Sequence, residues 1–361
     1  MVAPADARFM GRALALAERG LGRTSPNPVA GAVVVSPDGV VVGQGAHLVA
    51  GGPHAEVIAL DEAGPRARGA TLYCTLEPCC HTGRTGPCVE RIAAAGIARV
   101  VAATWDRNPR VERRGFAWLR EHGIEVVEGV GEAEAVRLNG PFFCWVVRGR
   151  PFVTLKAVVS QDGFVGRVGA PVRLSGAAAD RYFHRQRAAT DAIAVGAATV
   201  LVDDPLLTVR GAHRTRPFTR VLFDWSLRLT PGGRVFSTLE AGPIIMVVSG
   251  REAEARPDVV AEFERRGITI EPVDGRVVGP ILTRLAGREI VSLLVEGGPR
   301  LHTAFLAERL VDRVQRVVTP EVLGQGVAVA PGLDAVEAGE TTRRILLGRD
   351  ELWETDVHWA D

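Results

Sequence analysis

Three side chains that bind zinc well, His54, Cys79 and Cys88, lie so far apart in the sequence that only a folded chain can bring them together. A catalytic zinc uses three protein ligands and keeps a fourth position for water, whose pKa the metal lowers towards neutrality. Glu56 adds a carboxylate that can move the protons of that water. We therefore expect a fold that gathers these four residues around one zinc ion per chain.

The local pattern indicates how the chain brings these residues together. His54 follows a Gly-Gly-Pro turn and opens an apolar helical run, and Cys88 opens a second one. His54 and Glu56 do not share a helix face, so the metal has to lie beyond the helix N-terminus. The positive end of each helix dipole favours thiolates there. Residues 70–76 predict a strand, and Cys79 follows shortly after the end of that strand.

Other interpretations of these residues are open. A purely structural zinc needs a fourth protein ligand, which Cys80 or His81 can supply. Five cysteines without a secretory segment argue against a disulfide framework. A His-x-Glu pattern followed by Pro-Cys is typical of zinc deaminases. Nucleic-acid deaminases have two residues between their cysteines, whereas eight separate Cys79 from Cys88.

The longer spacing points to a narrower family. Residues 75–88, TLEPCCHTGRTGPC, resemble the bifunctional pyrimidine deaminase/reductase of riboflavin biosynthesis, and so do residues 26–31, PNPVAG. The resemblance covers nearly the whole chain. It implies an α/β protein with a cytidine-deaminase-like α/β/α sandwich at residues 1–147 and a dihydrofolate-reductase-like α/β domain at residues 150–361.

The residues themselves also predict two α/β units. A chain of 361 residues is long enough for two cores, and residues 148–151, polar and containing Gly and Pro, are typical of a boundary. The first half has predicted helices at 6–18 and 116–122 and strands at 32–35, 40–42, 70–76, 99–103 and 124–127. The second half has predicted strands at 152–160, 192–196, 221–224, 244–248, 268–270, 291–295, 323–324 and in the tail, and helices at 177–189 (with Ser175 as N-cap), 257–266, 278–286 and 300–309.

Charge and hydropathy exclude several classes of partner. The formal net charge of +1 gives no basic field for nucleic acid. No apolar run reaches membrane-spanning length, and the N-terminus lacks a signal-peptide pattern. We therefore expect a cytoplasmic enzyme with a small-molecule substrate and no nucleic-acid or membrane partner. We also expect a homo-oligomer.

Lys156 is the single lysine among 43 lysine and arginine residues. A compact, rotatable ammonium differs chemically from a planar guanidinium. A lysine at this position therefore indicates a site where a guanidinium group does not fit. The alternative is that the lysine occurs there by chance. The position matches the active-site lysine of the similar family, which makes Lys156 the predicted catalytic residue of the second domain.

The resemblance also implies binding residues. A strand, a glycine turn and a helix N-terminus at residues 291–309 form an anion site, which the resemblance makes the cofactor pyrophosphate loop. The implied substrate-binding residues are Asn27, Arg187, Arg210 and Glu296, and the implied contacts of NADPH are Val158, Thr199, Asp203, Gly298, Pro299 and Arg300. The chain departs from the family at Gln161 and Trp225, where leucine and serine are common, and at residues 172–175.

Two consecutive reactions follow from the resemblance. A diaminopyrimidinone ribosyl phosphate loses an amino group as ammonia, with Glu56 shuttling protons for the zinc-activated water. NADPH then reduces the ribosyl side chain to a ribityl chain, while Lys156 orients the substrate or aids protonation of the ring oxygen. Two alternatives remain. One is a deaminase of another free base or nucleoside with a non-catalytic second domain, and the other is a non-catalytic zinc module.

Overall fold

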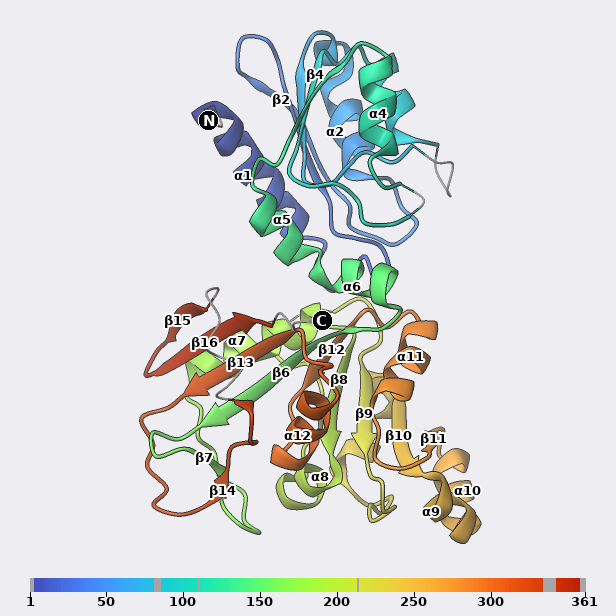
Figure 1. The fold of residues 1–361 in the computed structure, drawn as a ribbon, viewed down its shortest axis with the longest axis vertical. Coiled ribbons are helices and arrows are strands. Elements are labelled where there is room, and N and C mark those ends of the chain that lie inside the picture. The colour runs from blue at the N-terminus through green and yellow to red at the C-terminus, as the bar shows by residue number, and fades with distance from the viewer. Residues whose placement is uncertain (1–2, 81–85, 110, 213, 334–341, 358–361) are drawn as a thin grey trace. The chain divides into compact units, whose positions relative to one another are not determined.

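The structure is a computed structural model that describes residues 3–80, 86–109, 111–212, 214–333 and 342–357. It forms two compact units, Met1–Gly149 and Arg150–Asp361 (Figure 1). His81, an alternative fourth zinc ligand, lies outside the described residues. Each unit has its own sheet and its own hydrophobic core.

The first unit is a three-layer α/β/α sandwich around a five-stranded sheet with the order β2-β1-β3-β4-β5. β1 pairs with β2 and β3 in antiparallel fashion, and β3, β4 and β5 run parallel. One face packs against α1 and α5, and the other against α2, α3 and α4. The strands are β1 (Gly31–Val35), β2 (Val41–Ala46), β3 (Thr71–Cys74), β4 (Arg99–Ala102) and β5 (Glu125–Glu128), and the helices are α1 (Pro4–Glu18), α2 (Ala55–Ala63), α3 (Cys88–Ala94), α4 (Arg114–Glu121), α5 (Glu132–Leu138) and α6 (Gly140–Arg148).

The close contact between α2 and β2 fixes the helix that carries two of the predicted site residues. A Cβ atom on Gly45 of β2 would lie 2.1 Å from the carbonyl oxygen of Ala55, and one on Gly43 would lie 2.1 Å from that of Ala59. Because only glycine fits there, the helix backbone lies directly on the strand. The N-terminus of α2 is therefore held rigidly against the sheet.

The second unit contains a nine-stranded sheet with the order β11-β10-β9-β8-β12-β6-β13-β16-β15. The strands from β11 to β13 are parallel, and β16 and β15 are antiparallel additions at one edge. The strands are β6 (Phe152–Val159), β8 (Ala192–Gly196), β9 (Thr219–Phe223), β10 (Ile244–Ser249), β11 (Thr269–Val273), β12 (Ser292–Val295), β13 (Arg313–Val318), β15 (Arg343–Leu347) and β16 (Asp350–Asp356), and a separate pair is formed by β7 (Phe164–Gly166) and β14 (Val327–Ala328).

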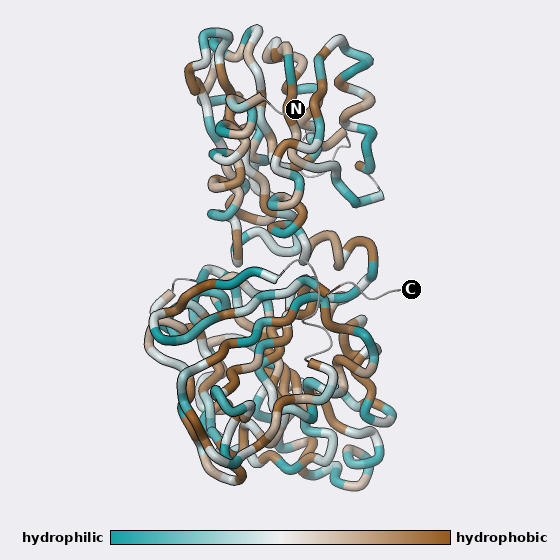
Figure 2. The backbone as a smooth tube through the Cα atoms, turned by 60° about the vertical axis from the view of Figure 1, so that its left-hand side comes forward, coloured by the Kyte–Doolittle hydropathy of each residue, from teal (hydrophilic) through white to brown (hydrophobic). Residues whose placement is uncertain are grey.

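Helices cover both faces of this larger sheet. One face packs against α11 and α12, and the other against α8 and α10, with α7 over its β13 and β16 end. The helices are α7 (Ala177–Ala189), α8 (Ala197–Asp203), α9 (Gly250–Ala255), α10 (Pro257–Arg265), α11 (Gly279–Gly287) and α12 (Pro299–Ala307). Figure 2 shows hydrophobic runs in the interior of each unit. Among the described residues, no helix is long and apolar enough to cross a membrane.

Most predicted elements are confirmed within a few residues, and two details are wrong. Ser175 is not the N-cap of α7, because Gly176 takes that position and donates its N–H to Asp350 Oδ2 at 2.7 Å, a contact with a distant strand. Leu323 and Gly324 do not form a strand, because their N–H groups bind the carboxylate of Asp162 at 3.1 and 2.7 Å. The prediction also omitted the helices α5, α6, α8 and α9, which are all nine residues or shorter, and the strands β7, β13 and β14.

Candidate functional site

The three predicted zinc ligands converge at two helix N-termini in the first unit. His54 is the N-cap of α2, Cys88 is the first residue of α3, and Cys79 follows β3. His54 Nδ1 lies 3.2 Å from Cys88 Sγ and 3.5 Å from Cys79 Sγ, and the three ligand atoms all lie within 4.8 Å of one another. In a tetrahedral zinc site, the usual Zn–N and Zn–S bond lengths place the nitrogen and sulfur ligand atoms roughly 3.6 Å apart. The side chains therefore fit a zinc ion.

The ligands also have the electrostatics that a metal site needs. Hydrogen bonds from the Cys88 thiol, from His54 and from the Cys88 N–H at 3.3 Å lower the pKa of Cys79 to about 4, against the opposing effect of burial. The hydrogen bond with Cys79 raises the pKa of His54. The Cys88 thiol donates a hydrogen bond to Cys79, which raises the pKa of Cys88, and burial raises it further. Cys79 is therefore a thiolate at neutral pH.

Glu56 lies beside this cluster in the first turn of α2. Its side chain is buried, and Oε2 is 3.9 Å from Cys88 Sγ. Burial raises the pKa of Glu56 to about 7. A carboxyl group with a pKa near neutrality can both accept and return a proton. The position and the pKa fit a general acid–base group.

A pocket of about 270 Å³ opens beside Glu56 and includes Asn27 in its lining. Asn27 Nδ2 lies 3.3 Å from His47 Nε2, and His47 Nδ1 lies 3.0 Å from the carbonyl oxygen of Pro53. Since that carbonyl can only accept, His47 Nδ1 carries the proton and Nε2 accepts from the amide of Asn27. His47 thus orients the amide of Asn27. Sequence reasoning missed His47, although a second histidine shortly before His54 was a signal.

Glu77 and Asp106 are two further carboxyl groups of the pocket lining that sequence reasoning did not select. Glu77 is buried and accepts the N–H groups of Asp106, Arg113 and Gly115 at 3.1, 2.9 and 2.8 Å. It therefore ties the loop of Cys79 to the N-terminus of α4. Burial raises the pKa of Asp106 to about 6. The acidic residue directly before Pro-Cys was the available signal for Glu77.

In the second unit, Lys156, Glu296 and Arg187 form a buried charged cluster. Lys156 Nζ lies 3.2 Å from Glu296 Oε2, and Arg187 Nε and Nη2 donate to the two carboxylate oxygens at 2.8 and 2.7 Å. The side chains of Lys156, Glu296 and Arg187 are only 12, 11 and 16% exposed, respectively. The parallel pairing of β6 with β12 brings Lys156 of β6 close to Glu296, which directly follows β12.

The charges of this cluster are coupled. Burial acts to raise the pKa of Glu296, but Lys156 and Arg187 outweigh it and hold that pKa below its usual value. Burial lowers the pKa of Lys156, although Glu296 opposes this. The ammonium also lies 4.1 Å above the ring of Phe183. Lys156 is therefore confined on one side by a carboxylate and on another by an aromatic ring.

The predicted cofactor residues lie at the carboxyl ends of adjacent parallel strands. Gly298 is the N-cap of α12, which Pro299 and Arg300 begin, and Thr199 and Asp203 are on α8, directly after β8. A Cβ atom on Gly298 would meet nothing within 4 Å, so the turn is open. Free N–H groups at such a crevice fit the anionic part of a dinucleotide.

Two predicted residues do not join the Lys156 cluster. Val158 packs against the hydrophobic cluster of α7, β13 and β16. Arg210 is exposed, and its Nη2 lies 3.3 Å from His184 Nε2.

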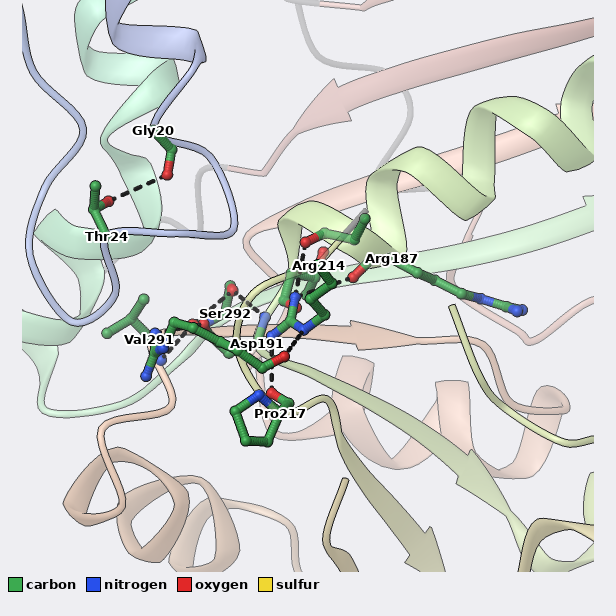
Figure 3. A network of polar contacts seen from close by, with 11 residues as sticks. Gly20, Thr24, Arg187, Asp191, Arg214, Pro217, Val291 and Ser292 are labelled. Carbon is green, nitrogen blue, oxygen red and sulfur yellow. Dashed lines mark hydrogen bonds and ion pairs between the residues drawn. The ribbon is translucent and has the colours of Figure 1, made fainter. Parts of the chain in front are cut away.

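A polar network anchors the elements that carry the charged cluster (Figure 3). Arg214 donates to the carbonyl oxygens of Ala188 and Thr190 at 2.8 and 2.6 Å, at the C-terminal end of α7. Asp191 Oδ2 accepts the N–H and the hydroxyl of Ser292 at 3.1 and 3.0 Å and so ties β8 to β12. The network holds the helix of Arg187 and the strand before Glu296 in place. Figure 3 also shows a contact within the first unit, in which the Thr24 hydroxyl donates to Gly20 after α1 at 3.4 Å.

Comparisons with known proteins match both units. Residues 4–104 match the cytidine and deoxycytidylate deaminase zinc-binding region, and residues 151–347 match the RibD C-terminal domain. Riboflavin biosynthesis protein RibD of Aquifex aeolicus is 39% identical over 346 residues, which cover 95% of each chain. RibD of Escherichia coli is 38% identical, with 91% of this chain and 92% of that protein covered.

Solved structures agree with these relatives. The RibD structure of Acinetobacter baumannii superposes with a TM-score of 0.83 at 33% identity and covers 98% of this chain and 99% of that one. A diaminohydroxyphosphoribosylaminopyrimidine deaminase/5-amino-6-(5-phosphoribosylamino)uracil reductase of Thermotoga maritima superposes with a TM-score of 0.85 at 35% identity and the same coverage. These matches confirm the predicted two-part α/β fold and do not favour a non-catalytic second domain. The chain therefore belongs to the RibD family, the bifunctional deaminase and reductase of riboflavin biosynthesis.

Proposed function

We propose that residues 1–147 release ammonia from a diaminopyrimidinone ribosyl phosphate and that residues 150–361 reduce the ribosyl side chain of the product with NADPH. The observation that carries the proposal is the convergence of His54, Cys79 and Cys88 beside a buried Glu56. The deaminase/reductase of Thermotoga maritima combines both activities in one chain, which supports the assignment of one reaction to each unit.

In the deaminase site, His54, Cys79 and Cys88 would hold one zinc ion, which supplies the Lewis acidity that lowers the pKa of water. Glu56 accepts a proton from the attacking water and returns it to the departing amine. Asn27 presents its amide to the pyrimidine edge, in the orientation that His47 imposes. A buried site excludes bulk water and so strengthens these interactions.

In the reductase site, NADPH supplies the hydride when it is bound. Gly298, Pro299 and Arg300 would bind its pyrophosphate, and Thr199 and Asp203 would be further contacts of the same cofactor. Lys156 orients the sugar or donates a proton to the ring oxygen, and Glu296 holds the ammonium at 3.2 Å. Val158 is a further proposed contact of NADPH. Arg187 and Arg210 are the substrate contacts proposed from the resemblance.

The cellular setting and assembly complete the proposal. None of the five cysteines is in a disulfide bond, which supports a reducing, cytoplasmic location. A homo-oligomer remains a prediction that sedimentation of the full-length chain can test.

The test follows both products in one reaction. The full-length chain is incubated with the diaminopyrimidinone ribosyl phosphate, with and without NADPH, while ammonia and NADPH absorbance are recorded. We expect ammonia in both reactions and NADPH oxidation only after deamination. NADPH oxidation without ammonia release would reject the proposed order, and ammonia release from unrelated free bases at the same rate would reject the substrate.

A further inference from the structure

A buried polar row crosses the reductase sheet beside Lys156. The row contains Lys156 on β6, Gln315 on β13 and Glu354 on β16, which are direct partners in the strand register. These three strands are neighbours in the nine-stranded sheet (Figure 1). Side chains of paired residues on adjacent strands project from the same face of a sheet. The three side chains therefore lie side by side.

The polar row lies on the α7 side of the sheet. Two residues away on each strand, the hydrophobic cluster under α7 begins, with Val158, Val317 and Leu352. Because side chains alternate between the two faces of a strand, residues two positions apart share a face. Phe183 of α7 belongs to the same cluster, and its ring lies 4.1 Å from Lys156 Nζ. The polar row is thus covered by α7 and has an apolar row beside it.

Gln315 is oriented by Glu354 and keeps one polar atom unused. Its side chain is buried, and its Nε2 donates to Glu354 Oε2 at 2.7 Å. Since a carboxylate only accepts, this bond fixes which branch of the amide faces β16. The other branch, Oε1, is buried and has no hydrogen-bond partner within the described residues. A buried carbonyl oxygen without a donor costs stability, so a donor that can reach it is favoured.

Lys156 is such a donor. An ammonium group has three N–H donors, and the hydrogen bond of Lys156 within the described residues goes to Glu296 Oε2 at 3.2 Å. β6 and β13 are adjacent strands, about 4.8 Å apart, and lysine has a long side chain with rotatable bonds. Rotation about these bonds moves Nζ from Glu296 towards Gln315.

We propose that Gln315 is a positioning residue of the reductase, whose Oε1 is a second acceptor for the ammonium of Lys156. The ammonium alternates between Glu296 and Gln315, so it stays hydrogen-bonded when the substrate engages Glu296. The proposal rests on the proposed reductase function. The bond from Gln315 to Glu354 polarises the amide and makes Oε1 a stronger acceptor. A neutral acceptor also holds the ammonium without cancelling its charge.

Several charged groups act on Lys156 besides this amide. Burial lowers the pKa of Lys156, and the charge of Arg187 acts in the same direction. The carboxylates of Glu296 and Asp180 act in the opposite direction. Glu354 lies one strand beyond the amide of Gln315. A hydrogen bond to the charged form of a group favours that form, so loss of the Gln315 carbonyl should lower the pKa of Lys156 further.

The single lysine of the chain permits a direct measurement. In full-length protein that contains ¹³C-labelled lysine, every lysine side-chain signal in an NMR spectrum comes from Lys156. Gln315→Met removes the carbonyl and keeps an unbranched side chain of similar length. Val317→Ala, on the same strand and face, is the matched control for lost packing. Gln315→Val, with a better strand propensity, replaces the methionine variant if that protein does not fold.

We expect the titration midpoint of the Lys156 signal to fall by about one pH unit in Gln315→Met and to stay unchanged in Val317→Ala. Equal midpoints in the wild type and Gln315→Met would overturn the proposal. An equal fall in both variants would overturn it as well, because the cause would then be packing. The measurement needs no turnover, so a fall in Gln315→Met alone supports the contact even if the wild type oxidises no NADPH and the proposed function fails.

Steady-state NADPH oxidation on the deaminated intermediate gives the functional readout, with ammonia release from the first substrate as the control for folding. Gln315→Met should lower kcat about tenfold and leave KM nearly unchanged, since a displaced ammonium affects the reaction more than binding. Gln315→Glu, which in its protonated form donates to Glu354 and presents a carbonyl oxygen, should recover most of kcat. An unchanged kcat in Gln315→Met would reject the positioning role, and a rise in KM alone would make Gln315 a substrate contact instead.

Discussion

Replacement of Lys156 by arginine should strongly impair the reductase and leave the deaminase intact. Lys156 Nζ reaches Glu296 Oε2 at 3.2 Å, while Arg187 already occupies both carboxylate oxygens. A second guanidinium group has no free bidentate partner there, and Phe183 lies 4.1 Å from the ammonium on another side. The wider, planar group therefore has to turn towards the substrate space.

The expected loss is about a hundredfold in kcat/KM for NADPH oxidation. A displacement of about an ångström of the reacting groups costs on this order, which is about 2.7 kcal/mol of transition-state stabilisation. The assay is steady-state NADPH oxidation on the deaminated intermediate, beside ammonia release from the first substrate as an internal control for folding. Lys156→Met is the matched variant, since Arg187 still balances the charge of Glu296. Full reductase activity in the Lys156→Arg protein would refute the reasoning.

Three other predictions follow from the described residues. Glu56→Gln should keep zinc, measured by metal analysis, and lose roughly a hundredfold or more in deamination, and near-normal turnover would contradict its role. Separate fragments 1–147 and 150–361 should deaminate and reduce, respectively, and soluble fragments with exchanged activities would disprove the division. Burial lowers the pKa of His302 to about 4 from 6.5. Its contribution to stability is therefore complete above pH 6.5 and is lost as the pH falls towards 4, by up to about 3 kcal/mol. His302→Leu should flatten that part of the pH dependence of urea unfolding, and an unchanged slope would refute it.

The zinc ligands could be predicted because the helix and strand signals that place each of them lie within a few residues of it. His54 and Cys88 each open an apolar helical run, and both runs form helices at the predicted positions. The strand before Cys79 was equally clear from its apolar run. Because metal chemistry restricts the types and the number of ligands, these residues could be predicted to lie together, and the structure brings the ligand atoms of His54, Cys79 and Cys88 within 4.8 Å of one another. By contrast, the N–H groups that donate to Glu77 belong to Arg113 and Gly115, and no sequence pattern indicates that these residues lie beside it.

The details of the second unit depend on contacts between distant segments. The start of α7 is set by Asp350, which lies 174 residues after Gly176 in the sequence. Residues 323–324 read as a strand by hydropathy, but the carboxylate of Asp162 takes their N–H groups. No local pattern announces such a partner, since each contact joins residues more than 100 positions apart. Most strands of the nine-stranded sheet were therefore predictable, whereas β13, the cap of α7 and the loop at residues 323–324 were not.

The reductase cluster shows why a residue type alone does not decide its role. Arginine suits phosphate because its donors form a planar fork, and that argument applied equally to Arg187 and Arg210. The structure separates them by their partners: Arg187 binds the carboxylate of Glu296 through two hydrogen bonds, whereas Arg210 contacts His184 at 3.3 Å. Lys156 and Arg187 hold the pKa of Glu296 below its usual value, so Glu296 is ionised at neutral pH and can anchor Lys156 without taking its proton. In the proposed function, Lys156 then presents a charged ammonium group to the substrate.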